Sequence, residues 1–144
     1  MSSEPLLLFA EDDENDALLF SLALRKAGVL NPVAHVIDGE DAINYLSGAG
    51  KYADRLQHPL PCVLVTDLKM PKRSGFDVLA WIQNYLAAGS LPVIVLSASE
   101  QELDKKRALD LGAQAYWAKP TEFEDLVHLA RELHDTWLAP HSLA

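Results

Sequence analysis

The chain has 144 residues, 49% of them apolar, and a formal net charge of −9 with its histidines neutral. This length and apolar content suit a folded domain with its own core, and they exclude a disordered chain. The acidic balance excludes a nucleic-acid-binding surface, which would be basic, and no run approaches the roughly 20 apolar residues of a membrane span.

The N-terminus and the cysteine content both indicate a cytoplasmic protein. The first residues lack the basic segment and long apolar stretch of a secretory signal peptide. Cys62 is the only cysteine, so no internal disulfide bond can form. We interpret Cys62 as a small apolar residue of the core in a reducing compartment, and not as a catalytic thiol.

Short apolar runs alternate with longer helical patterns along the chain. The runs predicted to be strands lie at residues 6–10, 33–37, 62–66, 93–96 and 115–117. The segments predicted to be helices lie at residues 15–27, 42–46, 75–86, 100–111 and 122–137. Five such strand–helix units predict an α/β fold, a doubly wound parallel sheet with helices on both faces and right-handed connections.

Local signals predict where several helices begin. Asp13 is placed to cap the first helix, because acidic residues favour a helix N-terminus. The pair Ser74-Gly75 opens the third helix, and Ser99 is expected to cap the fourth. Residues 121–124, Thr-Glu-Phe-Glu, have the pattern of a capping box at the start of the last helix.

Two further segments carry structural expectations. Leu18, Leu19 and Leu22 are expected on the buried side of the first helix, which Gly28 ends. Residues 47–61 are broken by glycine, proline and charged residues, and this pattern predicts a loop longer than most α/β connections.

The domain organisation is predicted to be simple. No internal repeat, low-complexity tract or linker interrupts the alternating pattern. The chain shows neither a DNA-binding helix pair nor a second catalytic region. We therefore expect one domain over residues 1–144, with its core between about residues 6 and 137, and no output domain.

Polar residues follow four of the predicted strands. Glu11 and Asp12 follow the first strand, Asp67 the third, Ser97 the fourth and Lys119 the fifth. The carboxyl ends of parallel strands share one edge of the sheet, which is the usual place for a ligand site in an open α/β fold. We therefore expect these side chains to converge.

Three carboxylates at one edge call for a cation. Two charges about 4 Å apart repel by roughly 4 kcal/mol at an effective dielectric near 20, unless a cation neutralises them or a proton is retained. Oxygen ligands without histidine or cysteine point to Mg²⁺. Lys119 and Ser97 add an ammonium and a hydroxyl that suit phosphoryl oxygens, and Asp67 is the best candidate for a carboxylate nucleophile.

The order of these features resembles a response-regulator receiver domain of bacterial two-component signalling. The resemblance covers residues 6–137 and rests on five features, which are Glu11-Asp12, Asp67 with Met70-Pro71 and Gly75, Ser97-Ala98, Tyr116, and Lys119-Pro120. It implies the flavodoxin-like (βα)5 fold with strand order 2-1-3-4-5. Any one feature is weak, but the ordered set is specific.

The resemblance also implies roles for individual residues. Asp67 would accept a phosphoryl group from a histidine of a sensor histidine kinase. Glu11, Asp12 and Asp67, with the backbone carbonyl of Lys69, would hold Mg²⁺. The protein would catalyse only its own phosphorylation and dephosphorylation, and would turn over no independent substrate.

Three more residues receive roles from the resemblance. Ser97 would hydrogen-bond the phosphoryl group and Lys119 would pair with one of its oxygens. Tyr116 would change rotamer as Ser97 moves inward. The resemblance further implies a cis peptide bond between Lys119 and Pro120, which would aim the lysine at the site.

A narrower resemblance concerns residues 48–54 and 134–138. Both segments look like those of stand-alone regulators that partner cyanobacterial and other bacterial phytochromes. This likeness implies a bacteriophytochrome kinase as partner and a homodimer. The signal would leave by protein–protein contact, either with a target or by phosphotransfer to another histidine-containing protein.

Two alternatives remain at this point. A Mg²⁺-dependent phosphatase of the haloacid-dehalogenase class would also use an aspartyl nucleophile, but it places a second aspartate two residues later, where this chain has Lys69. A receiver-like binding module that works without phosphorylation is the other alternative. Failure to bind Mg²⁺ would favour that module.

Overall fold

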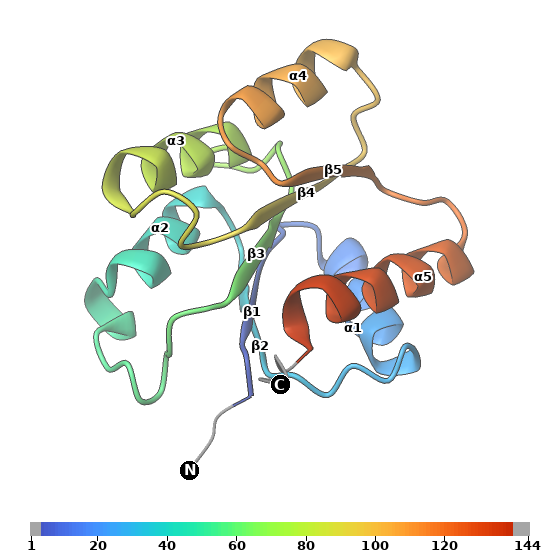
Figure 1. Cartoon of the computed structure of the whole chain (residues 1–144), viewed down its shortest axis with the longest axis horizontal. Coiled ribbons are helices and arrows are strands. Elements are labelled where there is room, and N and C mark those ends of the chain that lie inside the picture. The colour runs from blue at the N-terminus through green and yellow to red at the C-terminus, as the bar shows by residue number, and fades with distance from the viewer. Residues whose placement is uncertain (1–3, 140–144) are drawn as a thin grey trace.

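The computed structural model describes residues 4–139 and contains one five-stranded sheet (Figure 1). Its strands are β1 (Leu7–Ala10), β2 (Val33–Val36), β3 (Val63–Thr66), β4 (Val93–Ser97) and β5 (Ala115–Ala118). All neighbouring strands are parallel, and their order is β2-β1-β3-β4-β5. The predicted fold class and strand order are therefore confirmed.

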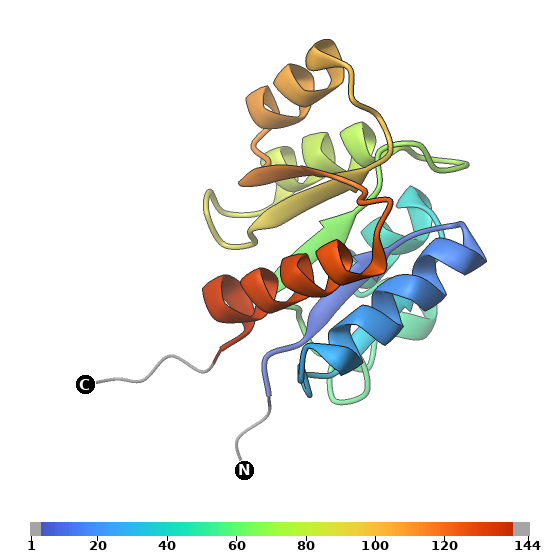
Figure 2. The same cartoon turned by 90° about the vertical axis from the view of Figure 1, so that its right-hand side faces the viewer.

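Helices cover both faces of this sheet (Figures 1 and 2). Within residues 4–139, the α-helices are α1 (Glu14–Lys26), α2 (Gly39–Ser47), α3 (Gly75–Tyr85), α4 (Glu102–Asp110) and α5 (Phe123–Leu133). Helices α1 and α5 pack together on one face, and α2, α3 and α4 lie on the other. A π-helical turn, His134–Leu138, continues α5. None of the described helices has the length and apolar content needed to cross a membrane.

The strands separate two apolar cores by simple alternation. In β1, Leu7 and Phe9 face the α1/α5 side, whereas Leu8 and Ala10 face the α2/α3 side. Every residue of β1 and β3 is buried, as expected for inner strands of a parallel sheet with both faces covered. Full burial explains why these strands appear in the sequence as unbroken apolar runs.

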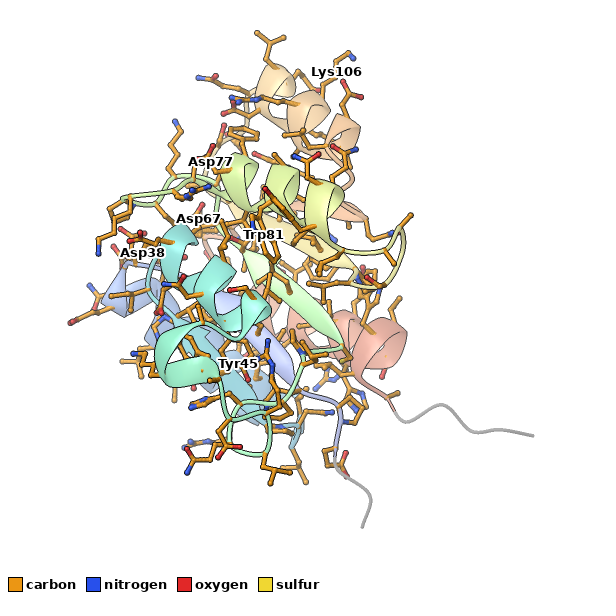
Figure 3. All side chains as sticks on the ribbon, turned by 90° about the vertical axis from the view of Figure 1, so that its left-hand side faces the viewer. Asp38, Tyr45, Asp67, Asp77, Trp81 and Lys106 are labelled. Atoms are coloured by element: carbon orange, nitrogen blue, oxygen red, sulfur yellow. The ribbon has the colours of Figure 1, made fainter. Side chains whose placement is uncertain are left out.

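Side-chain caps fix the starts of three helices at the carboxyl edge of the sheet. Asp13 accepts a hydrogen bond from the Asp16 N–H and so caps α1. Ser74 and Asp77 form a capping box at α3, and this confirms the predicted start of that helix. Asp38, the N-cap of α2, lies at the same edge as Asp67, whereas Tyr45 lies towards the other end of α2 (Figure 3).

Two predicted caps are wrong. Helix α4 begins at Glu102 and not directly after Ser99. The Ser99 Oγ accepts from the Gln101 N–H and closes a turn ahead of the helix. Helix α5 begins at Phe123 without a side-chain cap, and no capping box forms over residues 121–124. Acidic residues in the first turn of α5 complement the helix dipole in its place.

The predicted buried side of α1 is also wrong. Leu18, Leu19 and Leu22 are 58%, 44% and 41% exposed. The buried residues of α1 are Phe20, Ala23 and Leu24. Their spacing of one, three and four residues places them on a single helical face. The leucine-rich sequence of α1 has apolar residues on two faces, and periodicity alone does not show which of the two is buried.

The segment 47–61 is more ordered than the predicted loop. It contains a 3-10 turn, Gly50–Tyr52, and the Tyr52 hydroxyl donates to Asp41 Oδ1 at 2.6 Å. The Arg55 guanidinium donates to the carbonyls of Tyr45, Leu46 and His58 at 2.8, 2.9 and 3.1 Å. Arg55 therefore satisfies carbonyl groups that the end of α2 leaves free.

Candidate functional site

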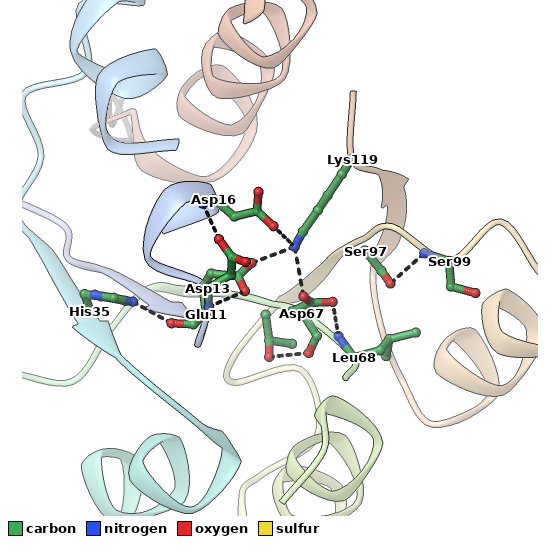
Figure 4. A network of polar contacts seen from close by, with 10 residues as sticks. Glu11, Asp13, Asp16, His35, Asp67, Leu68, Ser97, Ser99 and Lys119 are labelled. Carbon is green, nitrogen blue, oxygen red and sulfur yellow. Dashed lines mark hydrogen bonds and ion pairs between the residues drawn. The ribbon is translucent and has the colours of Figure 1, made fainter. Parts of the chain in front are cut away.

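Strand register brings the polar residues of the site to one level. Ala10 pairs with both Val36 and Thr66, so Glu11 and Asp67 leave their strands side by side. Ser97 pairs with Ala118, which places Lys119 just beyond the end of β4. These side chains surround one small region at the carboxyl edge of the sheet (Figure 4).

Asp67 is buried and is held at both carboxylate oxygens. Its Oδ1 accepts from the Leu68 N–H at 2.7 Å, and its Oδ2 accepts from Lys119 Nζ at 2.9 Å. Gly75 lies directly against the backbone of Asp67, where any Cβ would collide with the Asp67 carbonyl oxygen. Glycine at the start of α3 is therefore a requirement of the close approach between that helix and Asp67.

Lys119 joins three carboxylates. Its Nζ lies 2.8 Å from Glu11 Oε1, 2.7 Å from Asp16 Oδ2 and 2.9 Å from Asp67 Oδ2. An ammonium group has three N–H donors, so all of them are used. Burial alone would lower the pKa of Lys119, but the hydrogen bonds to Asp16, Glu11 and Asp67 together raise that pKa above its ordinary value. Lys119 is therefore charged at neutral pH.

Glu11, Asp12 and Asp67 form an oxygen-rich group. One carboxylate oxygen from each lies within 4.8 Å of the other two. Burial raises the pKa of Glu11, the charge of Asp67 adds to this effect, and Lys119 and the Asp13 N–H oppose it. Closely spaced carboxylates with no histidine or cysteine fit a hard divalent cation such as Mg²⁺.

A pocket of about 360 Å³ opens beside Asp67. Lys69 and Ser97 also line this pocket, and the Ser97 Oγ accepts from the Ser99 N–H at 3.1 Å. The space lies between the acidic group and the loop that leads into α4. It is large enough for a phosphoryl group and its surrounding water.

The structure thus brings Glu11, Asp12, Asp67 and Lys119 into one cluster, with Ser97 and Lys69 across a shared pocket. Tyr116 lies outside this cluster, because its hydroxyl donates to the Ser99 carbonyl at 2.7 Å. The peptide bond before Pro120 is trans, so the implied cis bond is wrong. The trans form is the intrinsic preference of X–Pro bonds, by about 0.5–1 kcal/mol.

Asp16 is the site residue that the sequence did not reveal. It stands in the first turn of α1 and makes the shortest of the three Lys119 contacts. Acidic residues in a first helical turn are common because they complement the helix dipole. The sequence therefore held no signal that separates Asp16 from an ordinary helix-start residue.

Comparison with known families identifies the protein family to which the chain belongs. Residues 7–131 match the family described as response regulator receiver domain. The chain belongs to this family. Receiver domains are signalling modules of two-component systems, and they bind Mg²⁺ or Mn²⁺ at an acidic cluster. The acidic group of this receiver domain lies at the carboxyl ends of β1 and β3.

Three solved structures show which receiver domains are similar to this one. Response regulator RPA3017 in red light signaling of R. palustris is 32% identical, with 97% of this chain and 98% of that chain covered and a TM-score of 0.87. The phosphorylated cyanobacterial phytochrome response regulator RcpA is 30% identical, with 98% of each chain covered and a TM-score of 0.85. The Mn²⁺-bound response regulator Rcp1 is 27% identical, with 97% and 99% covered and a TM-score of 0.82.

These similarities support the narrower resemblance as well as the family. Among the structures similar to this receiver domain are stand-alone regulators associated with phytochromes. The similarity extends over nearly the whole of each chain.

Proposed function

We propose that this receiver domain is a phosphoacceptor switch, in which Asp67 takes a phosphoryl group from a phosphohistidine of a sensor kinase. The observation that carries the proposal is the setting of Asp67. One of its carboxylate oxygens is bound by Lys119, the whole group belongs to an acidic cluster, and it faces an open pocket. A buried aspartate with a purely structural role would need neither neighbouring carboxylates nor an open pocket beside it.

In the transfer step, a carboxylate oxygen of Asp67 attacks the phosphorus atom. The bond between phosphorus and the imidazole nitrogen breaks and leaves its electron pair on that nitrogen, and the histidine departs as neutral imidazole because its other ring nitrogen carries a proton. Glu11, Asp12, Asp67 and the backbone carbonyl of Lys69 would hold Mg²⁺, which supplies charge neutralisation for the phosphoryl oxygens. The Lys119 ammonium stabilises negative charge on the same oxygens.

The output is a change in the surface beyond the pocket. Phosphorylation adds about −1.5 to −2 charge, and this charge attracts the Ser97 hydroxyl and the Lys119 ammonium to the phosphoryl oxygens on Asp67. Movement of Ser97 breaks its contact with the Ser99 N–H, and the Tyr116 hydroxyl is bound to the carbonyl of the same Ser99. The loop before α4 therefore connects the pocket to Tyr116 and to the face formed by α4, β5 and α5.

The partner is a sensor histidine kinase, and a bacteriophytochrome is the partner class that the similar regulators support. We place this exchange in the cytoplasm. The receiver domain acts as a single unit, forms a homodimer, and signals by contact with a target or by phosphotransfer. It turns over no substrate besides its own phosphoryl group.

Intact-protein mass spectrometry after incubation with acetyl phosphate and Mg²⁺ tests the proposal. We expect one phosphoryl adduct in the wild-type protein and none with a chelator or in Asp67→Asn. A folded wild-type protein without an adduct would leave the binding module as the better account. Steady release of phosphate from p-nitrophenyl phosphate would instead favour the phosphatase.

A further inference from the structure

Asp16 occupies a place at the site that the proposed chemistry does not use. Two of the three carboxylates on Lys119, Glu11 and Asp67, belong to the group suited to a divalent cation. Asp16 does not belong to that group, yet its Oδ2 lies 2.7 Å from Lys119 Nζ. It is therefore the one carboxylate partner of Lys119, within residues 4–139, that stands outside the acidic group.

The position of Asp16 is fixed by the start of α1. Its backbone N–H donates to Asp13 Oδ1 at 2.9 Å, so the helix cap sets where the Asp16 side chain begins. Helix α1 packs along α5, which begins just after Lys119. The Asp16 side chain is 41% exposed and that of Lys119 is 17% exposed, so the contact lies at the outer rim of the site.

A cation bound by Glu11 and Asp67 would weaken two of the three contacts of Lys119. The metal would neutralise both carboxylates and would also repel the ammonium group. Phosphorylation would then bond one Asp67 oxygen to phosphorus and remove its negative charge. The contact with Asp16 is the only one of the three that neither event removes.

We propose that Asp16 is a positioning residue that holds the Lys119 ammonium at the pocket while Glu11 and Asp67 bind the metal. Asp16 touches neither the metal nor the phosphoryl group and acts only through Lys119. The inference rests on the proposed phosphoacceptor function and adds a residue to it.

The test compares Asp16→Asn with Glu14→Gln. Both changes remove one negative charge from the first turn of α1, and Glu14 is exposed and has no ion pair in the described structure. At saturating acetyl phosphate, we expect Asp16→Asn to phosphorylate about tenfold more slowly, as loss of one charge-assisted hydrogen bond implies. Glu14→Gln should stay within about twofold of wild type, and calorimetry should give all three proteins the same Kd for Mg²⁺.

A second readout reports on Lys119 itself. An ammonium group held by carboxylates gives a slowly exchanging side-chain N–H signal in NMR, which Lys119→Gln assigns by its loss. In Mg²⁺-loaded protein, this signal should persist in wild type and Glu14→Gln and vanish in Asp16→Asn. If Asp16 had only a structural role, the Asp16→Asn substitution would leave the Lys119 N–H signal unchanged.

Each outcome decides one point. An Asp16→Asn protein with wild-type rate and an intact Lys119 signal overturns the inference and leaves the phosphoacceptor function standing. A slower rate with weaker Mg²⁺ binding also overturns it, because Asp16 would then belong to the metal site. If wild type takes no phosphoryl group, the proposed function fails, and the NMR signal alone decides whether Asp16 positions Lys119.

Discussion

Glu11 shows how burial and charge oppose each other at a single residue. Its side chain is 2% exposed, and burial raises the pKa of its carboxyl above the ordinary value of 4.5. The folded protein therefore binds a proton at Glu11 more tightly than the unfolded chain does. This contribution to stability is complete below the unfolded pKa and is lost as the pH rises through the folded pKa.

Replacement of Glu11 by glutamine should therefore stabilise the metal-free protein at pH 7. The variant loses the cost of a buried negative charge beside Asp67, while Lys119 keeps its contacts with Asp16 and Asp67. Thermal melts in chelator from pH 7 to pH 4 should show a higher Tm for Glu11→Gln at neutral pH. The difference should shrink as Glu11 itself becomes protonated in both states.

Asp12→Asn is the matched control, because Asp12 is exposed and belongs to the same acidic group. It should change Tm less than Glu11→Gln does. A lower Tm for Glu11→Gln at pH 7 would show that the Lys119 contact outweighs the cost of burial.

At the residue scale, the sequence predicted which side chains would meet but not all of their partners. Glu11, Asp12, Asp67 and Lys119 each end or follow a strand, and parallel strands bring such ends together. Their chemical roles stay predictions. Asp16 stands on a helix, and its contact with Lys119 depends on the packing of α1 beside the fifth strand–helix unit, which no local pattern specifies.

Among the elements, α3 depends on a glycine at its first position. Gly75→Ala would drive a methyl group into the Asp67 carbonyl, so we expect the free energy of unfolding to fall by about 2 kcal/mol. Displacement of Asp67 should also weaken Mg²⁺ binding, which a calorimetric titration would measure.

Gly89→Ala separates this clash from a general cost of losing glycine. Gly89 has a positive φ of 76° but open space around it. Its replacement should cost about 1 kcal/mol of stability and leave the Kd for Mg²⁺ unchanged. Equal Mg²⁺ affinities in the two variants would contradict the role assigned to Gly75.

The segment after α2 depends on Arg55. Arg55→Ala removes hydrogen bonds to three carbonyl groups, two of them at the end of α2, and should lower the free energy of unfolding by about 1.5–3 kcal/mol. Urea denaturation would measure this change. Arg25→Ala, at an exposed position in the last turn of α1, should stay within about 0.5 kcal/mol of wild type. Similar values for both variants would mean that Arg55 does not hold the segment.

The elements show what a sequence pattern can and cannot specify. The five strands were predictable because most of them are short apolar runs, and the inner ones are buried on both faces. The cap predicted at Ser99 was wrong because its hydroxyl donates to Asp104 and accepts from the Gln101 N–H, so it closes a local turn and does not cap α4. The order within residues 47–61 comes from Arg55 contacts across the segment, which have no periodic signal.

At the scale of the whole molecule, an acidic cluster in a chain of net charge −9 should couple metal binding to stability. A ligand that binds only the folded state adds about 2.7 kcal/mol of stability at a concentration 100 times its Kd. Mg²⁺ should therefore raise the Tm of the wild-type protein in a saturable way.

Sodium chloride at equal ionic strength is the control for general screening of the negative charge. It should raise the Tm much less than Mg²⁺ does, and Asp67→Asn should lose most of the specific increase. An identical response to both salts would show that the acidic group does not select a divalent cation.

The identity of the phosphorylated residue is the most direct test of a phosphoacceptor switch. Protein treated with acetyl phosphate and Mg²⁺ would be reduced with sodium borohydride, which converts an aspartyl phosphate to homoserine, and mapped by tandem mass spectrometry. We predict homoserine at residue 67 and at no other aspartate. An unmodified Asp67, with the conversion at Asp12 or at no residue, would contradict the assignment of Asp67 as the acceptor.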